Sequence, residues 1–202
     1  MIKMIKFISK TLFFIFLIFS VNAENKNLSI GNIKAKIVVK VFSSLTCPHC
    51  ASFHKNIFNE LKKDYIDQNL VRFEHYGFPL DLAAMNAEII VRCHISNEKK
   101  FKLLDKIYKN QSEWAVGSDI DVINKKIKKI GLDSGLDSDS MDKCLKNENI
   151  QDQILNERIE AQKKYKIQST PTIFINEKHY QGKHKYKSFK KEIEKVLNKY
   201  EI

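Results

Sequence analysis

The sequence predicts an α/β protein whose sheet is interrupted by a long run of helices. Between residues 36 and 76, a β-branched apolar run, a helical segment and a second strand follow one another, which is the order of a parallel β–α–β unit. From residue 82 to about residue 164, apolar residues recur at helical spacing and no strand pattern is found. Strand signals return only at residues 172–176. Roughly 80 residues of helix are therefore expected inside an α/β protein.

Five strands are expected. Residues 28–31 form a short candidate edge strand, and residues 36–43 are short, apolar and β-branched, as in a buried strand. Residues 70–76 form the next strand before glycine and proline end it. The sheet resumes at residues 172–176, and a turn leads to a short strand at residues 178–180. The last two strands are therefore expected to form a hairpin.

The helices are predicted from the spacing of their apolar residues. The first is expected from about Cys50 to Asp67, directly after the buried strand. The remaining helices are expected at residues 83–94, 101–108, 120–130, a short one from residue 137, 150–165 and, at the C-terminus, 189–197.

The first residues have the pattern of a secretory signal peptide. Lys3, Lys6 and Lys10 precede the almost wholly apolar segment Thr11–Val21, and cleavage is expected after Ala23. An uncleaved anchor is the alternative, but the apolar run is shorter than the roughly 20 residues that a spanning helix needs. The sequence thus predicts an exported, periplasmic protein.

The chain is basic, with a formal net charge of +11, which becomes +8 without the three signal lysines. Such a balance can indicate nucleic acid, anionic membranes or acidic partners. Export argues against nucleic acid, and the lysines alternate with Glu and Asp on amphipathic helices. A solvated lysine-rich surface is the simpler interpretation, and no nucleic-acid partner is expected.

Four cysteines in an exported chain indicate thiol–disulfide chemistry before metal binding. They divide into a close pair, Cys47 and Cys50, and a distant pair, Cys93 and Cys144. The distant pair either forms a structural bridge, closing a loop of about 50 residues, or remains as two buried thiols. No metal site and no cofactor is expected, since a zinc site built on the close pair would need two more ligands.

The motif Cys47-Pro48-His49-Cys50 is the candidate catalytic site. It lies between the buried strand and the first helix, where unpaired backbone N–H groups and the helix dipole favour a thiolate. Cys47 is expected to be the nucleophile and Cys50 the resolving cysteine. His49 can donate to the thiolate or interact with it as an imidazolium, and thereby lower the pKa of Cys47. A purely structural disulfide is the simpler alternative.

A second signature is Ser169-Thr170-Pro171-Thr172, directly before a strand. A proline at this position is a candidate for a cis peptide bond, although an ordinary trans proline is the alternative. If the loop lies beside the disulfide, the backbone of Thr170 is free to pair with an extended substrate peptide. Thr170 and Pro171 are therefore the candidate substrate-binding residues.

Together these residues resemble the DsbA-like thiol:disulfide oxidoreductases of bacterial periplasms. The matching segments are Cys47-Pro48-His49-Cys50 with residues 43–46 before it, Phe78-Pro79-Leu80-Asp81, and Thr170-Pro171-Thr172 with residues 174–176. The resemblance spans essentially the whole mature chain. It implies a thioredoxin fold with an inserted all-helical domain, in which residues 24–80 and 166–202 form the thioredoxin domain and residues 81–165 the insertion.

The resemblance also implies an activity and partners. An oxidase would introduce disulfides into exported proteins with free thiols and be reoxidised by a DsbB-like membrane partner; a monomer is expected. Cys93 and Cys144 look like the second disulfide of an α-proteobacterial subset. The chain departs from better-known members at Val41 and His54, where those have acidic residues, and at Thr170, where the best-known member has valine.

Two other functions stay open at this point. The first is a disulfide isomerase or reductase that uses the same cysteines. The second is a non-catalytic exported binding protein with the same fold. A Cys47→Ala variant separates the classes, because an enzyme loses all activity whereas a binding module keeps its partner.

Overall fold

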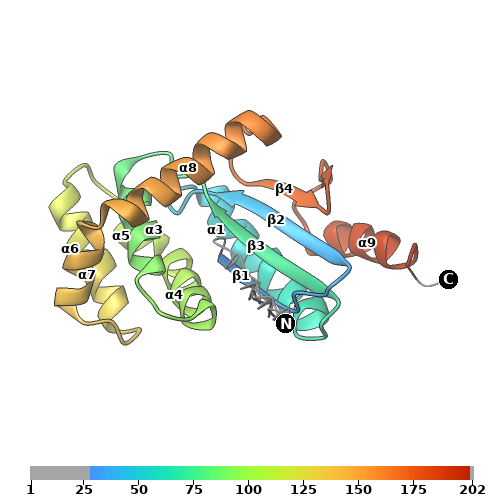
Figure 1. The fold of residues 1–202 in the computed structure, drawn as a ribbon, viewed down its shortest axis with the longest axis horizontal. Coiled ribbons are helices and arrows are strands. Elements are labelled where there is room, and N and C mark those ends of the chain that lie inside the picture. The colour runs from blue at the N-terminus through green and yellow to red at the C-terminus, as the bar shows by residue number, and fades with distance from the viewer. Residues whose placement is uncertain (1–27, 201–202) are drawn as a thin grey trace, which may run out of the picture.

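The computed structural model describes residues 28–200, so the predicted signal peptide lies outside the described residues. A mixed five-stranded sheet forms the centre, with strand order β1-β3-β2-β4-β5. β2 and β3 are parallel, as the β–α–β pattern predicted, and the other pairs are antiparallel (Figure 1). The strands are β1 (Leu28–Ile30), β2 (Ile37–Ser43), β3 (Val71–Gly77), β4 (Thr172–Ile175) and β5 (Lys178–His179).

One continuous helical run connects β2 to β3. It begins at Pro48, two residues earlier than the sequence pattern indicates, because proline is well suited to the first position of a helix. Two π-helical stretches interrupt it, which the apolar spacing did not predict. Its parts are α1 (Pro48–Phe53), η1 (His54–Phe58), α2 (Asn59–Leu61) and η2 (Lys62–Ile66).

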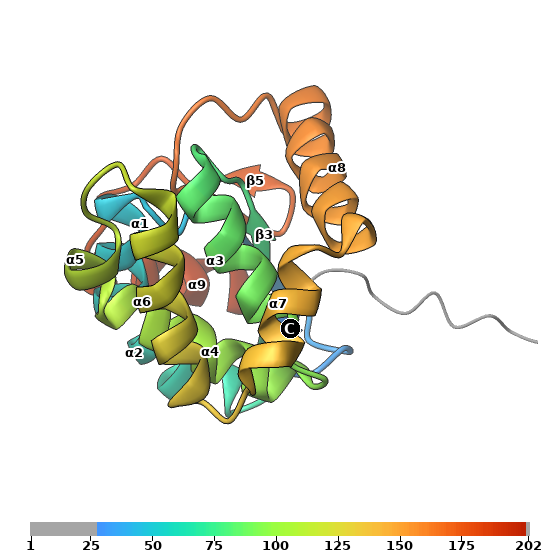
Figure 2. The same ribbon diagram turned by 90° about the vertical axis from the view of Figure 1, so that its left-hand side faces the viewer.

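Six helices lie between β3 and β4, which confirms the predicted helical insertion into the α/β chain. α3 is central and packs against four of the others, α4, α6, α7 and α8 (Figure 2). α5 was not expected, because four residues are too few to show a periodicity. The six are α3 (Leu82–Arg92), α4 (Asn97–Lys109), α5 (Gln111–Trp114), α6 (Ile120–Leu132), α7 (Ser138–Leu145) and α8 (Glu148–Tyr165).

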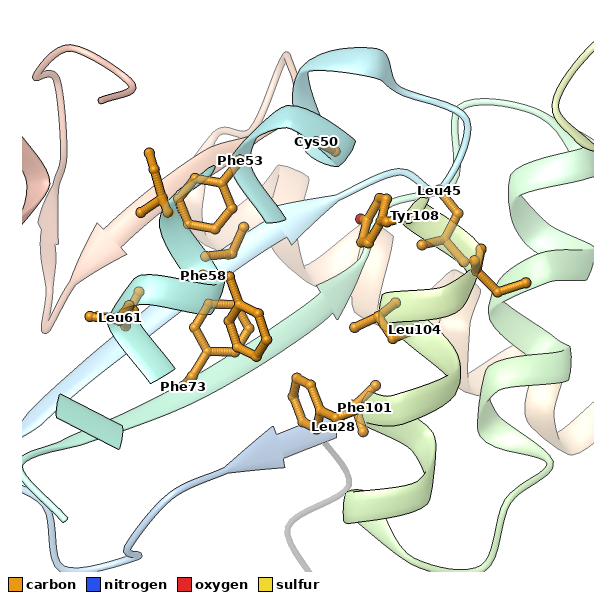
Figure 3. Close-up of a cluster of buried hydrophobic side chains, with 14 of the residues drawn as sticks. Leu28, Leu45, Cys50, Phe53, Phe58, Leu61, Phe73, Phe101, Leu104 and Tyr108 are labelled. Carbon is orange, nitrogen blue, oxygen red and sulfur yellow. The ribbon is translucent and has the colours of Figure 1, made fainter. Parts of the chain in front are cut away.

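The two faces of the sheet bury different side chains. On one face, Val39 and Val41 of β2 join a large core with α1, α4 and α9 (Tyr186–Leu197), and Figure 3 shows its aromatic part with Phe53, Phe58, Phe73 and Phe101. On the other face, Phe42 packs against the end of α8. Cys47 and Cys50 both belong to the first of these cores. Among residues 28–200, no helix is long and apolar enough to cross a bilayer.

Candidate redox site

The motif Cys47-Pro48-His49-Cys50 lies where the sequence placed it, at the start of α1. Cys47 is the N-cap, with φ −79° and ψ 119°, and its carbonyl accepts from the N–H groups of Cys50 at 3.1 Å and Ala51 at 3.2 Å. Pro48 occupies the first turn and has no N–H to satisfy. The first turn of α1 therefore closes on the carbonyl of Cys47.

The Cys47 sulfur is stabilised as a thiolate. Its pKa is lowered from 9.0 to about 5, chiefly because the Cys50 thiol donates a hydrogen bond to it. Burial opposes the shift, whereas the Thr170 side chain and the backbone N–H groups of Cys50 and His49 add to it. In the thiol form, Cys47 Sγ donates to the Thr170 carbonyl at 3.3 Å. The local chemistry therefore favours a reactive thiolate at Cys47.

Cys50 has the opposite character. Cys50 is 1% exposed, and burial raises the pKa of its thiol far above the ordinary value. The neighbouring Cys47 adds to this shift, because a thiolate there accepts a hydrogen bond from the Cys50 thiol and repels a second negative charge. The pair therefore holds its charge on Cys47 and its proton on Cys50.

The Thr170–Pro171 loop lies against the cysteines, and its peptide bond is cis. The antiparallel pairing of β2 and β4 sets Thr172 opposite Phe42, which brings two segments far apart in the chain to one edge. The Thr170 hydroxyl is buried and has no hydrogen-bond partner among the described residues. The thiolate of Cys47 can accept from it, which agrees with the lowered pKa of that thiol.

The loop before Cys47 is held by the segment that opens α3. Thr46 Oγ1 donates to Asp81 Oδ2 at 2.7 Å, and Asp81 Oδ1 caps α3 by accepting from Ala84 N at 2.7 Å. Ser44 Oγ accepts from Leu80 N at 3.3 Å. In the sequence these two segments are notable only for the family resemblance, and no local pattern shows that they contact each other.

His49 lies on the surface of the motif, with its side chain exposed. The backbone N–H of His49 contributes to the lowered pKa of the Cys47 thiol. The His49 side chain is near His184, whose pKa is lowered first by burial and then by the charge of His49. The tuning role of the His49 imidazole stays a prediction.

The two positions that depart from the family pattern lie in the core. Val41 is 1% exposed and pairs in register with His75 of β3. His75 Nε2 is 3.0 Å from Glu88 Oε2, and Glu88 also contacts Arg92 at 3.1 Å. Burial opposes ionisation of Glu88, yet the charges of His75 and Arg92 outweigh it and lower its pKa to about 2. A buried ionic cluster thus lies beside the strand position that lacks an acid.

His54 is buried against the aromatic core. Its ring stacks on Phe58 at a centroid distance of 4.4 Å and lies 4.8 Å from Tyr108, while Nε2 is 3.3 Å from Asp105 Oδ1. Burial lowers the pKa of His54, although Asp105 opposes the shift. Tyr108 has a buried hydroxyl without a hydrogen-bond partner among residues 28–200, and burial, then the charge of Cys50, raises its pKa.

The distant cysteine pair is joined in the structure. Cys93 at the end of α3 forms a disulfide with Cys144 of α7, with a Cα–Cα distance of 6.0 Å. Cys47 and Cys50 are both unbridged. Within the described part of the chain, no group of three or more His, Cys, Asp or Glu side chains could hold a metal ion.

The sheet with its Cys-x-x-Cys motif and cis-proline loop is the arrangement found in the thioredoxin family. A sequence profile of that family, described as thioredoxin, matches residues 23–195, and the chain belongs to this family. The sheet, the helical insertion and the cysteine motif together give it a DsbA-like thioredoxin fold.

Particular relatives place the chain more closely. It is 31% identical over 153 residues to a Rickettsia bellii protein provisionally named a protein-disulfide oxidoreductase, covering 76% of this chain and 58% of that protein. It is 28% identical over 178 residues to disulfide bond formation protein D of Bacillus subtilis, covering 83% and 76%. The chain thus spans little more than half the length of its Rickettsia relative.

A solved structure shows the same similarity. The crystal structure of Wolbachia pipientis alpha-DsbA1 superposes with a TM-score of 0.79 at 27% identity, covering 86% of this chain and 92% of that one. The oxidised BdbD structure from Bacillus subtilis has a TM-score of 0.75 at 21% identity, which supports the fold alone.

Proposed function

We propose that this protein is a thiol:disulfide oxidase that introduces disulfide bonds into exported proteins through Cys47 and Cys50. The observation that carries the proposal is the polarised pair, in which the pKa of Cys47 is lowered to about 5 while burial keeps Cys50 a thiol. Stabilising the thiolate stabilises the reduced pair, so the disulfide form is the stronger oxidant.

The reaction follows from this asymmetry. A substrate thiolate attacks Sγ of Cys47, the Cys47–Cys50 bond breaks, and Cys50 leaves with the electron pair and takes up a proton. The second substrate thiolate then attacks the substrate sulfur of the mixed disulfide, and Cys47 leaves as a thiolate. Two electrons pass from the substrate to the protein, and a thiol of low pKa is the better leaving group in the second step.

The surroundings of the motif support binding of extended, apolar chains. Thr170 and Pro171 lie beside Cys47, where backbone groups of an incoming peptide can pair with the loop. Three large apolar side chains are exposed on segments adjoining the redox loop: Leu80 at 51%, Leu82 at 60% and Val116 at 48%. Unfolded exported proteins with free thiols are the proposed substrates.

The compartment and the reoxidising partner belong to the same proposal. Disulfide-forming chemistry requires an oxidising compartment, and the predicted signal peptide at residues 1–23 supplies export to the periplasm. The reduced pair must return its two electrons to an acceptor after each cycle. The family resemblance supports a DsbB-like membrane protein in that role. The same resemblance supports a division of this chain into a helical unit, residues 81–165, and a thioredoxin unit formed by the rest of the mature chain.

The deciding experiment is the redox equilibrium of Cys47 and Cys50 with glutathione. An oxidase is expected to have a potential well above the thioredoxin value of about −270 mV. A potential at the thioredoxin value would overturn the oxidase assignment and favour a reductase. Cys50→Ala then provides a second readout, because it should trap mixed disulfides between Cys47 and exported proteins, whereas Cys47→Ala should trap none.

A further inference from the structure

A side chain of the helical segment bonds directly to the backbone of the redox loop. Gln111, the first residue of α5, is 9% exposed, and its Nε2 lies 2.7 Å from the Leu45 carbonyl oxygen and 3.0 Å from that of Cys47. Carbonyl oxygens only accept hydrogen bonds, so the amide nitrogen must face them. Both protons of this amide are therefore used on the loop that ends at Cys47.

Gln111 is itself firmly placed. At the other end of α5, Trp114 is fully buried, and its Nε1 donates to the Ile107 carbonyl at 2.8 Å. The backbone of α5 continues from α4, and the Gln111 carbonyl accepts from Ala115 N at 2.9 Å. The packing of α5 therefore fixes the position of the Gln111 amide. Gln111 lies 64 residues from Cys47 in the sequence.

The bonded carbonyl belongs to the turn that carries the reactive sulfur. The Cys47 carbonyl also accepts from Cys50 N and Ala51 N, which form the first turn of α1. Backbone N–H groups of this turn lower the pKa of the Cys47 thiol. A hydrogen bond that fixes the Cys47 peptide therefore also fixes the direction in which these N–H groups meet the sulfur.

We propose that Gln111 is a positioning residue of the redox site, whose two hydrogen bonds hold the Leu45–Cys47 loop in the geometry that Cys47 needs for thiol–disulfide exchange. The inference rests on the proposed role of Cys47 and Cys50 as the redox pair. It gives the helical segment a direct part in setting the reactivity of Cys47. Gln111 does not touch the reacting atoms and acts only through the loop.

The test replaces Gln111 by methionine, which has a similar shape but no donor. The pKa of Cys47, measured by thiolate absorbance of the reduced protein, is expected to rise by about half to one unit, because the N–H groups of the first turn then meet the sulfur less favourably. The glutathione equilibrium should shift about three- to tenfold towards the oxidised protein, making it a weaker oxidant. The rate of substrate oxidation should fall in parallel.

The matched control is Gln151→Met. The Gln151 amide donates to the Leu145 carbonyl at 2.8 Å, also within the helical segment but between α7 and α8. Its loss also removes a side-chain hydrogen bond of the helical segment but should leave the pKa of Cys47 unchanged. A purely structural role of Gln111 would make the two variants alike, so equal Cys47 pKa values in Gln111→Met, Gln151→Met and wild type overturn the proposal.

A milder variant keeps the test decisive if Gln111→Met does not fold. Gln111→Asn retains the amide but withdraws it by one methylene, and should raise the pKa of Cys47 in the same direction by a smaller amount; a wild-type value there overturns the proposal. The thiol titration needs no substrate. An inactive wild-type protein would therefore contradict the proposed function, while the Gln111 comparison would still be read from the titration.

Discussion

The two cysteine pairs of this chain share one protein and one proposed compartment but differ in every physical respect. Cys47 and Cys50 are separated by three positions, are unbridged, and lie at the start of a helix whose N–H groups favour a thiolate. Cys93 and Cys144 are separated by 51 positions, and their disulfide joins two helices. The local backbone, rather than the residue type, therefore separates a reactive pair from a structural one.

The two cysteine pairs should differ most in their contribution to activity. Cys47→Ala removes the proposed nucleophile and should abolish oxidation of a reduced dithiol peptide, a loss of at least about a thousandfold. The Cys93→Ala/Cys144→Ala double variant should stay within a few-fold of wild type in the same assay. Comparable losses in both would mean that the distant pair also takes part in exchange.

For the stability of the fold, the distant pair should matter more than the close pair. Removing the Cys93–Cys144 bridge should lower the free energy of unfolding by about 2–4 kcal/mol, since the bridge restricts a long loop in the unfolded chain. Urea unfolding of the double alanine variant and of wild type, both with Cys47 and Cys50 kept reduced, measures the difference. An unchanged midpoint would show that packing of α3 against α7 is sufficient without the bridge.

The pH dependence of the reduced protein sharpens the comparison further. The pKa of Cys47 is depressed from 9.0 to about 5, so its ionisation contributes stability that is complete above pH 9 and lost as the pH falls towards 5. Relative to Cys47→Ala, reduced wild type should therefore become more stable between about pH 5 and pH 9. Parallel curves for the two proteins would contradict a depressed pKa.

A smaller change in stability is expected at Tyr108, a buried residue near Cys50. Tyr108→Phe removes a buried hydroxyl that has no partner in the described chain. Leaving a polar group buried and unpaired is costly, so its removal should be neutral or stabilising by up to about 1 kcal/mol. Thermal unfolding measures this, and a clear loss of stability would show that the hydroxyl is hydrogen-bonded in solution.

The sequence predicted the parts of the site that depend on local pattern. Cys47-Pro48-His49-Cys50 and Thr170-Pro171 each stand at a junction between a strand and another element, so the strand periodicity on either side placed them. The parallel β–α–β unit and the long helical insertion followed from the same periodicity. Such features can be predicted from the spacing of residues along a single helix or strand.

What the sequence could not show depends on partners far apart in the chain. Gln111 is one amide among many until its contact with the Cys47 carbonyl is known. Glu88 on α3 gives no signal that it meets His75 of β3. Val41 stands where better-known members of the family have an acidic residue, which suggests that another ionisable group lies nearby. Only the β2–β3 register identifies His75 as that neighbour.

The helix α8 has a mechanical consequence. It runs unbroken for 18 residues, about 27 Å, past both parts of the molecule (Figure 1). Midway, Glu157 receives two hydrogen bonds from Arg92 of α3, at 2.8 and 2.6 Å, and one turn later Ala161 joins the cluster of Phe42 on the sheet. α8 is therefore fixed to α3 by the Arg92–Glu157 pair and to the sheet by packing, so a movement of α3 relative to the sheet would have to bend α8 or break that pair.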